Sequence, residues 1–151
     1  MNVYRGCAFP DDLLYDVAQD VWVRWDETNR IATLGMTDPA QSRGGKLVSV
    51  SFKPIGRVVP RGKSFATIES GKWVGAFPAP LSGEIVETNR ATFERDILMA
   101  NRDPYGEGWL VKIRPTRFAE EKSTLLDADA AFVEYQRKIE EWKINCMRCI
   151  D

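Results

Sequence analysis

Lys72 lies in the middle of a symmetric pattern of turn signals, and this pattern constrains the fold more than any other feature of the sequence. Gly62 ends a Val-Pro-Arg-Gly signal ten residues before the lysine, and Gly83 ends a Pro-Leu-Ser-Gly signal eleven residues after it. Each arm between the lysine and an outer turn has the length and the residue types of a β-strand. The sequence therefore predicts that Lys72 lies at the tip of a β-hairpin, where its exposed amine and long flexible stem suit enzymatic acylation.

The first two-thirds of the chain have the pattern of short strands joined by turns. Thr37 or Asp38 is placed to cap a short helix, with Pro39 in its first turn and Gly44-Gly45 at its end. A second short helix is expected over residues 91–100. The expected strands are residues 21–25, 31–36, 46–53, 57–59, 65–70, 73–77, 84–88 and 109–113.

The final third changes to a helical pattern. Asp127-Ala128-Asp129 has the features of the cap and acidic first turn of a helix, which we expect to span residues 127–149. Its apolar residues are three or four positions apart and so share one helix face. These residues are Phe132, Tyr135, Ile139, Trp142, Cys146 and Cys149. We expect this face to pack on the β-strands, so that residues 1–151 form a single domain.

Composition excludes several classes of function. The chain has 151 residues, a net charge of −1 and no histidine. This balance argues against nucleic-acid binding, and it excludes imidazole catalysis and histidine-ligated metals. No apolar run is long enough to span a membrane, and residues 1–7 lack the apolar stretch of a secretory signal. We therefore expect a cytoplasmic protein without a metal site.

The three cysteines leave several hypotheses open. An odd number of cysteines in a chain without a secretory signal argues against a disulfide framework. Because Cys146 and Cys149 fall on the apolar helix face, we expect them to be buried thiols. A thiol pair that closes with Cys7, and a thiol enzyme or metal module built on Cys146 and Cys149, remain alternatives.

Four separated blocks of sequence carry a resemblance to a known family. In their order and spacing they resemble the H-proteins of the glycine cleavage system, over about residues 15–135. The blocks are Thr33–Gln41, Ile68–Lys72, Ala79–Asn89 and Asn101–Ile113. The resemblance implies a mainly β fold, a flattened lipoyl- or biotinyl-type barrel (hammerhead) with short helices and a C-terminal helix. It also implies a carrier rather than an enzyme, with lipoate joined to Lys72 by an amide bond.

Departures from the usual H-protein pattern indicate a particular branch of the family. H-proteins usually have Ser-His-Glu-Trp where this chain has Gln19-Asp20-Val21-Trp22, and a histidine where it has Pro39. The segments Arg5–Pro10 and Glu69–Gly75 resemble the lipoate-binding proteins of the sulfur-oxidising heterodisulfide reductase-like pathway. That branch implies transport of a sulfur-bound intermediate to a heterodisulfide reductase-like complex.

Alternative hypotheses imply other partners and another prosthetic group. A lipoate-protein ligase or a lipoyltransferase would attach the lipoate. A glycine cleavage H-protein would carry an aminomethyl group between glycine decarboxylase and an aminomethyltransferase, with reoxidation by dihydrolipoyl dehydrogenase. Biotin is a rival group, but biotin carriers typically place methionine on both sides of the lysine, whereas Gly71 and Trp73 flank Lys72. An unmodified binding barrel, in which Lys72 is an ordinary solvated residue, is a further alternative.

Five further residues are candidates for the lipoyl site. Glu69 is either a polar residue at a strand end or a recognition residue for the attaching ligase. Gly71 is expected to provide a positive φ in the turn, and Trp73 either packs on the barrel or guides the arm. The family resemblance implies that Tyr105 and Glu107 lie near the cleft where the loaded arm docks.

Overall fold

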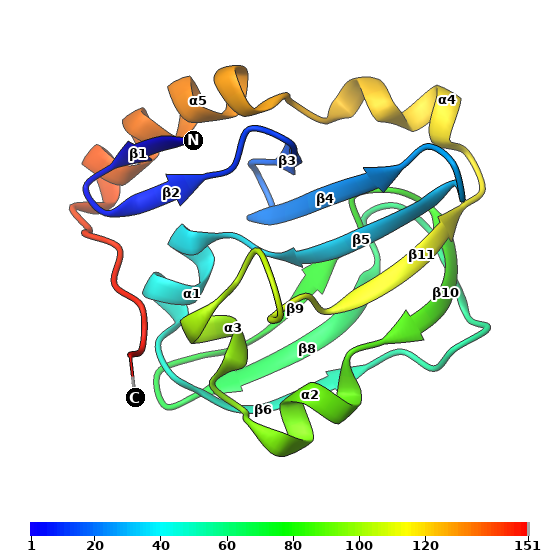
Figure 1. Cartoon of the computed structure of the whole chain (residues 1–151), viewed down its shortest axis with the longest axis horizontal. Helices are drawn as coiled ribbons and strands as arrows, with labels where there is room; N and C mark the ends of the chain where they lie inside the picture. Colours follow the sequence, from blue (N-terminus) through cyan, green and yellow to red (C-terminus); the bar gives the residue numbers. More distant parts are fainter. Residues whose placement is uncertain (151) are drawn as a thin grey trace.

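Two β-sheets pack against each other in the computed structural model, which describes residues 1–150 (Figure 1). The larger sheet has six strands in the order β3-β4-β5-β11-β10-β7, and the smaller sheet has three in the order β6-β8-β9. Their bounds are β3 Leu14–Asp16, β4 Val21–Asp26, β5 Ile31–Met36, β6 Leu47–Phe52, β7 Val58–Val59, β8 Ser64–Ser70, β9 Val74–Pro78, β10 Gly83–Thr88 and β11 Val111–Pro115. Neighbouring strands in both sheets are antiparallel.

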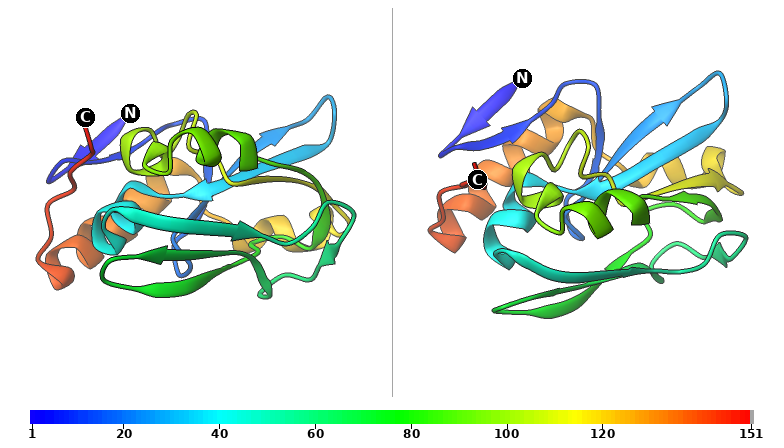
Figure 2. Two further views of the ribbon diagram at one scale, coloured as in Figure 1. Left: turned by 90° about the horizontal axis from the view of Figure 1, so that it is seen from below. Right: turned by 60° about the horizontal axis from the view of Figure 1, so that its bottom comes forward.

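Apolar side chains from both sheets form the core between them. Val23, Leu34 and Ile113 of the larger sheet are almost completely buried, as are Phe65 and Ile68 of the smaller sheet. Burial of such apolar surface is the dominant favourable contribution to folding. Seen from below, the smaller sheet forms a layer of its own (Figure 2). The expected mainly β fold is confirmed, and the flattened barrel consists of two sheets that, within residues 1–150, are not hydrogen-bonded into a closed cylinder.

Helix α1 (Asp38–Gly44) follows β5 and forms as its end signals predict. Thr37 Oγ1 accepts a hydrogen bond from the backbone N–H of Ala40 at 3.3 Å, and Pro39 occupies the first turn. The helix ends at Gly44 and is capped by Gly45, whose φ of 80° favours glycine. This short helix is important for the site because one of its sides borders the hairpin that carries Lys72.

The helix expected over residues 91–100 is divided into α2 (Arg90–Arg95) and α3 (Met99–Arg102). Asp96 interrupts it with an extended backbone, and its carboxylate accepts a hydrogen bond from the backbone N–H of Leu98 at 3.0 Å. Such a local bond competes with helical hydrogen bonding. Two more short helices, α4 (Phe118–Glu121) and η1 (Lys122–Thr124), follow β11.

Helix α5 (Ala128–Trp142) begins where it was expected but ends earlier. Asp127 caps its first turn through a side-chain hydrogen bond. Lys143 adopts the left-handed conformation with φ of 55°, and the chain then leaves the helix. The expectation that the helix continues through Cys146 and Cys149 is therefore wrong. Within residues 1–150, no helix is both long and apolar enough to cross a membrane.

An N-terminal hairpin, which the strand patterns did not predict, packs on α5. It consists of β1 (Asn2–Tyr4) and β2 (Cys7–Phe9). Phe9 stacks on Tyr135 of α5 with ring centroids 4.7 Å apart, and both rings are fully buried. Trp22 extends this second apolar cluster to the larger sheet. The strands of the hairpin have only three residues each, which is too short for a detectable alternation of apolar and polar residues.

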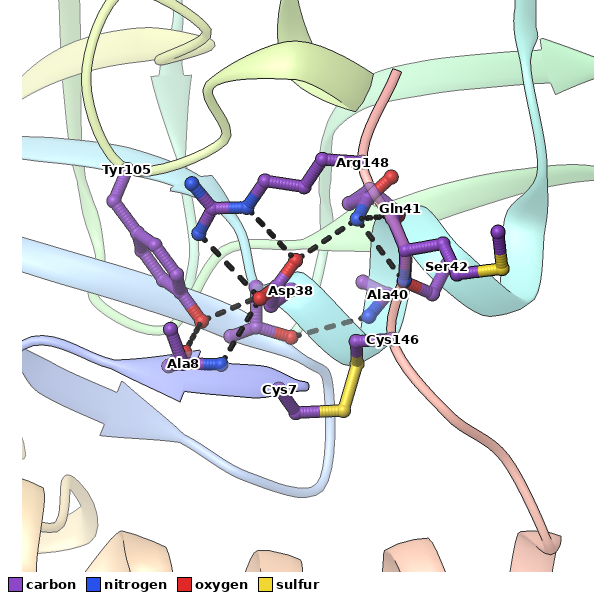
Figure 3. The surroundings of a disulfide bond; sticks show 11 residues. Cys7, Ala8, Asp38, Ala40, Gln41, Ser42, Tyr105, Cys146 and Arg148 are labelled. Atoms are coloured by element: carbon purple, nitrogen blue, oxygen red, sulfur yellow. Dashed lines mark hydrogen bonds and ion pairs between the residues drawn. A yellow bond between two sulfur atoms is a disulfide. The ribbon is translucent and has the colours of Figure 1, made fainter. Parts of the chain in front are cut away.

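A disulfide joins Cys7 of β2 to Cys146, beyond the end of α5 (Figure 3). The backbone N–H of Cys146 also donates to the carbonyl of Arg5 at 2.9 Å, which holds the two segments side by side. Cys149 is the free cysteine among the described residues. The expectation of buried thiols is wrong at both positions, because Cys146 is buried but oxidised and Cys149 is only partly buried. The alternative in which a C-terminal cysteine closes with Cys7 is confirmed, since the fold brings cysteines from opposite ends of the chain together. The Cys146–Cys149 thiol module loses one of its thiols to this disulfide, and no group of three or more metal-ligating side chains occurs within residues 1–150.

Loss of this disulfide is expected to lower the free energy of unfolding by about 2–5 kcal/mol. The bond closes a loop across 139 residues and so restricts the unfolded chain. Urea unfolding of Cys7→Ser without reductant gives the measurement. Cys149→Ser is the control, since it removes the free thiol and leaves the disulfide intact. Equal unfolding midpoints for Cys7→Ser and the wild type would contradict the prediction.

Candidate functional site

Lys72 lies at the tip of the hairpin formed by β8 and β9, as the spacing of the turn signals predicts. The two strands pair as far as Glu69, and Gly71 and Lys72 form the turn between them. The backbone N–H of Ser70 donates to the carbonyl of Trp73 at 2.8 Å and closes the turn. Ser70 is buried, whereas Lys72 is exposed. The lysine therefore projects from a rigid support.

The side chain of Ser70 organises this turn. Its Oγ accepts hydrogen bonds from the backbone N–H groups of Lys72, at 3.2 Å, and of Trp73, at 3.1 Å. Neither Gly71 nor Lys72 has a positive φ, and a Cβ added at Gly71 would meet no atom within 4 Å. The expectation that Gly71 supplies a left-handed conformation is therefore wrong, because a buried serine holds the turn instead.

Trp73 packs back along its own hairpin. Its indole covers Gly75 and meets the ring of Phe77 edge-on, with centroids 6.2 Å apart. It nevertheless remains 42% exposed, so part of the ring is available at the surface beside the lysine. Glu69 is also exposed, and its Oε1 accepts a hydrogen bond from Ser49 Oγ at 3.3 Å.

A cleft of about 410 Å³ lies beside the hairpin tip. The hairpin provides one part of its lining, and the turn between β3 and β4 and helix α1 provide the rest. The lining residues are Lys72, Trp73, Ala76 and Phe77, then Ala18, Gln19 and Asp20, then Ala40, Arg43 and Gly44. The stem of Lys72 lies against the end of α1, with Cε 3.3 Å from the position that a Cβ at Gly45 would take. Within residues 1–150, Lys72 Nζ has no hydrogen-bond or ion-pair partner.

Two opposite charges, Asp20 and Arg43, face the hairpin from the other part of the lining. Arg43 Nη1 lies 3.5 Å from Asp20 Oδ2, and its guanidinium stacks on the ring of Trp142 at 3.7 Å from the centroid. The hydroxyl of Tyr135 donates to Asp20 Oδ1 at 2.9 Å. Burial raises the pKa of Asp20, although the Tyr135 hydrogen bond and the Arg43 charge act in the opposite direction. The cleft thus combines a braced guanidinium with a largely buried carboxylate.

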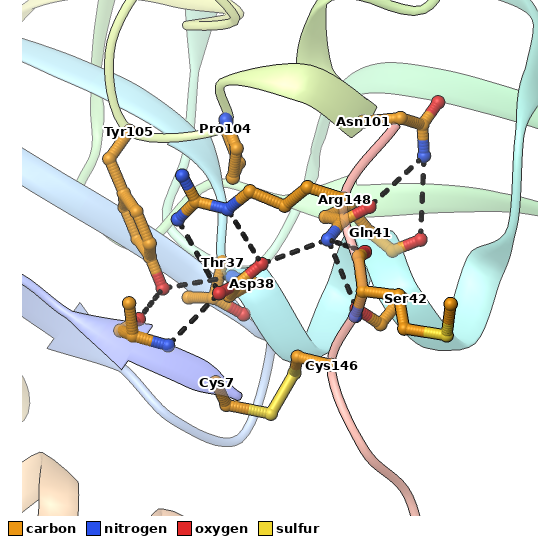
Figure 4. Close-up of polar contacts among 12 residues, drawn as sticks. Cys7, Thr37, Asp38, Gln41, Ser42, Asn101, Pro104, Tyr105, Cys146 and Arg148 are labelled. Atoms are coloured by element: carbon orange, nitrogen blue, oxygen red, sulfur yellow. Dashed lines mark hydrogen bonds and ion pairs between the residues drawn. A yellow bond between two sulfur atoms is a disulfide. The ribbon is translucent and has the colours of Figure 1, made fainter. Parts of the chain in front are cut away.

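Tyr105 lies away from this cleft, in a polar network around Asp38 (Figure 4). Its hydroxyl donates to the carbonyl of Ala8 at 2.6 Å and accepts from the backbone N–H of Asp38 at 2.8 Å. Glu107 is exposed in the loop that precedes β11. Neither residue lines the cleft, so the structure does not bring them together with Lys72.

The sequence patterns did not identify Asp20 and Arg43 as residues of the site. Both lie more than 25 positions before Lys72, and no local pattern connects a turn residue and a helix residue to a distant hairpin tip. One signal pointed to this region, namely the departure from the usual family residues at Gln19 and Asp20. This departure shows that Gln19 and Asp20 differ from the usual family residues, but it does not show that they lie opposite Lys72.

Comparisons with known proteins agree on one family. A family model of the glycine cleavage H-protein matches residues 13–139. Glycine cleavage system H protein 3 of Aquifex aeolicus is 46% identical over 150 residues, which cover 97% of this chain and 92% of the relative. Probable glycine cleavage system H protein 2 of Sulfolobus acidocaldarius is 41% identical over 150 residues, which cover 98% of this chain and 99% of the relative. The chain belongs to the glycine cleavage H-protein family.

A solved structure supports the same assignment. The crystal structure of a glycine cleavage system H protein from Mycobacterium marinum matches with a TM-score of 0.72 and 34% identity, over 84% of this chain and 98% of that one. Members of the H-protein family are carriers rather than catalysts, and they bear a lipoyl group covalently on a lysine. They work with glycine decarboxylase, an aminomethyltransferase, dihydrolipoamide dehydrogenase and a lipoyl ligase. Lys72 fits such an attachment, because its exposed amine is unpartnered within residues 1–150 and borders a cleft.

Gly75→Ala is expected to displace the Trp73 indole, because the added Cβ would overlap the ring, and to change the free energy of unfolding by only about 0.5 kcal/mol, because the ring is partly exposed and can move aside. The indole N–H resonance of Trp73 in an NMR spectrum reports the displacement, and urea unfolding reports the stability. Gly71→Ala is the matched control, since its Cβ would point into open space. Identical Trp73 resonances in both variants would show that the ring does not depend on Gly75.

Proposed function

We propose that this chain is a lipoylated carrier that shuttles a sulfur-bound intermediate on Lys72 to a heterodisulfide reductase-like complex. The observation that carries the proposal is the position of Lys72, at the exposed tip of a rigid hairpin and on the border of a cleft. The prosthetic group supplies a dithiolane, whose sulfur–sulfur bond opens to two thiols on uptake of two electrons and two protons. The chain supplies placement, which raises the local concentration of a tethered group at each partner.

The residues that face the lysine support a cargo other than the usual aminomethyl group. Gln19 and Asp20 line the cleft at positions where H-proteins usually have serine and histidine. Trp73, which directly follows the lysine, also borders the cleft. Partner enzymes and cargo meet these side chains directly, so changes at these positions alter specificity.

The names of the curated relatives favour a second candidate function. Both the Aquifex and the Sulfolobus relatives are named as H proteins of the glycine cleavage system. In that function the arm on Lys72 would receive an aminomethyl group from glycine decarboxylase and deliver it to an aminomethyltransferase. In either function a lipoate-protein ligase or lipoyltransferase modifies Lys72, and the exposed Glu69 forms part of the surface that this enzyme contacts.

Lys72→Arg is expected to abolish lipoylation completely, because arginine keeps the positive charge but cannot form the amide bond. Intact-mass analysis after incubation with lipoate, ATP and a lipoate-protein ligase gives the measurement. Lys63→Arg is the matched control, since Lys63 is exposed near the other end of β8. A lipoyl mass increment on Lys72→Arg, or none on the wild type, would refute Lys72 as the attachment site.

Protein isolated from its native host during growth on reduced sulfur is expected to carry additional sulfur on the lipoyl arm. Intact mass before and after reduction measures the adduct, and Lys72→Arg protein from the same cells is the control without an arm. The aminomethyl function makes a different prediction. If the lipoylated protein supports exchange of labelled bicarbonate into glycine by glycine decarboxylase, as an established H-protein does, and carries no sulfur adduct, the sulfur function is wrong.

A further inference from the structure

We propose that Arg43 makes the cleft beside Lys72 selective for a negatively charged group at the end of the lysine arm. The inference rests on the proposed function, because it concerns the group that a lipoylated Lys72 would bring into the cleft. The charged residues that line the cleft are Lys72, Asp20 and Arg43. Amide formation on Lys72 removes its charge. Asp20 and Arg43 therefore determine whether the cleft prefers a positively or a negatively charged arm.

Arg43 has hydrogen-bond donors available at the cleft. A guanidinium carries five N–H donors in a planar fork, and Arg43 makes one long hydrogen bond within the described residues, from Nη1 to Asp20 Oδ2 at 3.5 Å. Its side chain is 41% exposed. The ring of Trp142 covers one face of the guanidinium and fixes its plane without using any donor. Such a fork is suited to a carboxylate or to an oxyanion of sulfur.

Asp20 is a poor acceptor for a positively charged group. Both of its oxygens already receive donors, Oδ1 from the hydroxyl of Tyr135 and Oδ2 from Arg43. Its side chain is only 16% exposed. Burial also raises the pKa of this carboxyl and so disfavours its charged form. The cleft therefore has exposed and unused donors on Arg43, whereas the Asp20 carboxylate is largely buried and each of its oxygens already accepts a hydrogen bond, and this asymmetry favours an anion.

Three arms of matched size and different charge test the proposal. In lipoylated Cys149→Ser protein, dihydrolipoyl dehydrogenase and NADH reduce the arm, and intact mass confirms that only the arm is then alkylated. Iodoacetate gives a negatively charged arm, iodoacetamide a neutral one and bromoethylamine a positively charged one. NMR then compares the Arg43 Nε–H resonance and the backbone amides of residues 18–20 with those of the unlipoylated protein.

The negatively charged arm is expected to shift these resonances. Its ratio of docked to undocked protein is expected to be roughly tenfold higher than that of the neutral arm, which is the effect of one charge-assisted hydrogen bond. The positively charged arm is expected to dock least. Equal shifts for all three arms, no shift for any arm, or the largest shift for the positively charged arm would each overturn the proposal. Because this comparison uses the unsubstituted cleft, it does not depend on the folding of a cleft variant.

Two variants then assign the preference to Arg43. Arg43→Gln is expected to abolish the difference between the negatively charged and neutral arms, and Arg43→Lys to retain part of it, because lysine keeps the charge but not the planar fork. A preference that survives in Arg43→Gln would refute the role of Arg43. If Lys72 accepts no lipoate, the proposed function fails and this inference fails with it, whereas a lipoylated arm without charge preference refutes this inference alone.

Discussion

The buried carboxylate of Asp38 is the interaction on which the arrangement around Lys72 depends. Its side chain is 1% exposed, and its oxygens accept hydrogen bonds from the backbone N–H of Ala8 at 2.9 Å and from Gln41 Nε2 at 2.8 Å. The guanidinium of Arg148 pairs with it at 3.3 Å. A buried charge is costly unless it is paired and hydrogen-bonded. Asp38, the first residue of α1, therefore holds the N-terminal hairpin and the C-terminal segment in place. The other side of the same helix lines the cleft beside Lys72.

The hairpin combines a rigid base with a mobile attachment point. Ser70 is buried and holds the turn through two backbone N–H groups, so the Cα of Lys72 has a defined position. Beyond that point the lysine stem lies against the end of α1, and within residues 1–150 its Nζ has no hydrogen-bond or ion-pair partner. A defined base limits the volume that a tethered group explores, and a flexible stem lets it reach more than one partner. The backbone of Lys72 is thus held in place, whereas its side chain provides the range of movement.

Local signals were sufficient for the elements that carry the site, and they failed where the structure depends on distant residues. The turn spacing around Lys72 and the cap at Thr37 are encoded in adjacent residues, and both elements form as expected. The end of α5 was missed because Lys143 adopts a left-handed conformation that the sequence usually marks with glycine or asparagine. The Cys7–Cys146 disulfide joins residues that no local pattern relates. For the same reason the position of Lys72 at the hairpin tip was predicted from the sequence, but the presence of Arg43 beside it was not.

The terminal segments also connect the fold to the chemistry of the cleft. The family match ends at residue 139, and the Mycobacterium structure covers 84% of this chain, whereas the Aquifex and Sulfolobus relatives match over almost all of it. Trp142, which stacks on Arg43, and Arg148, which pairs with Asp38, both lie beyond the family match. The guanidinium of Arg43 in the cleft is thus braced by one residue, Trp142, that lies outside the part of the chain matched by the family model. The ring of Trp142 uses none of the donors of Arg43, which makes one long hydrogen bond to Asp20, so the terminal segment helps to determine which charge the cleft accepts.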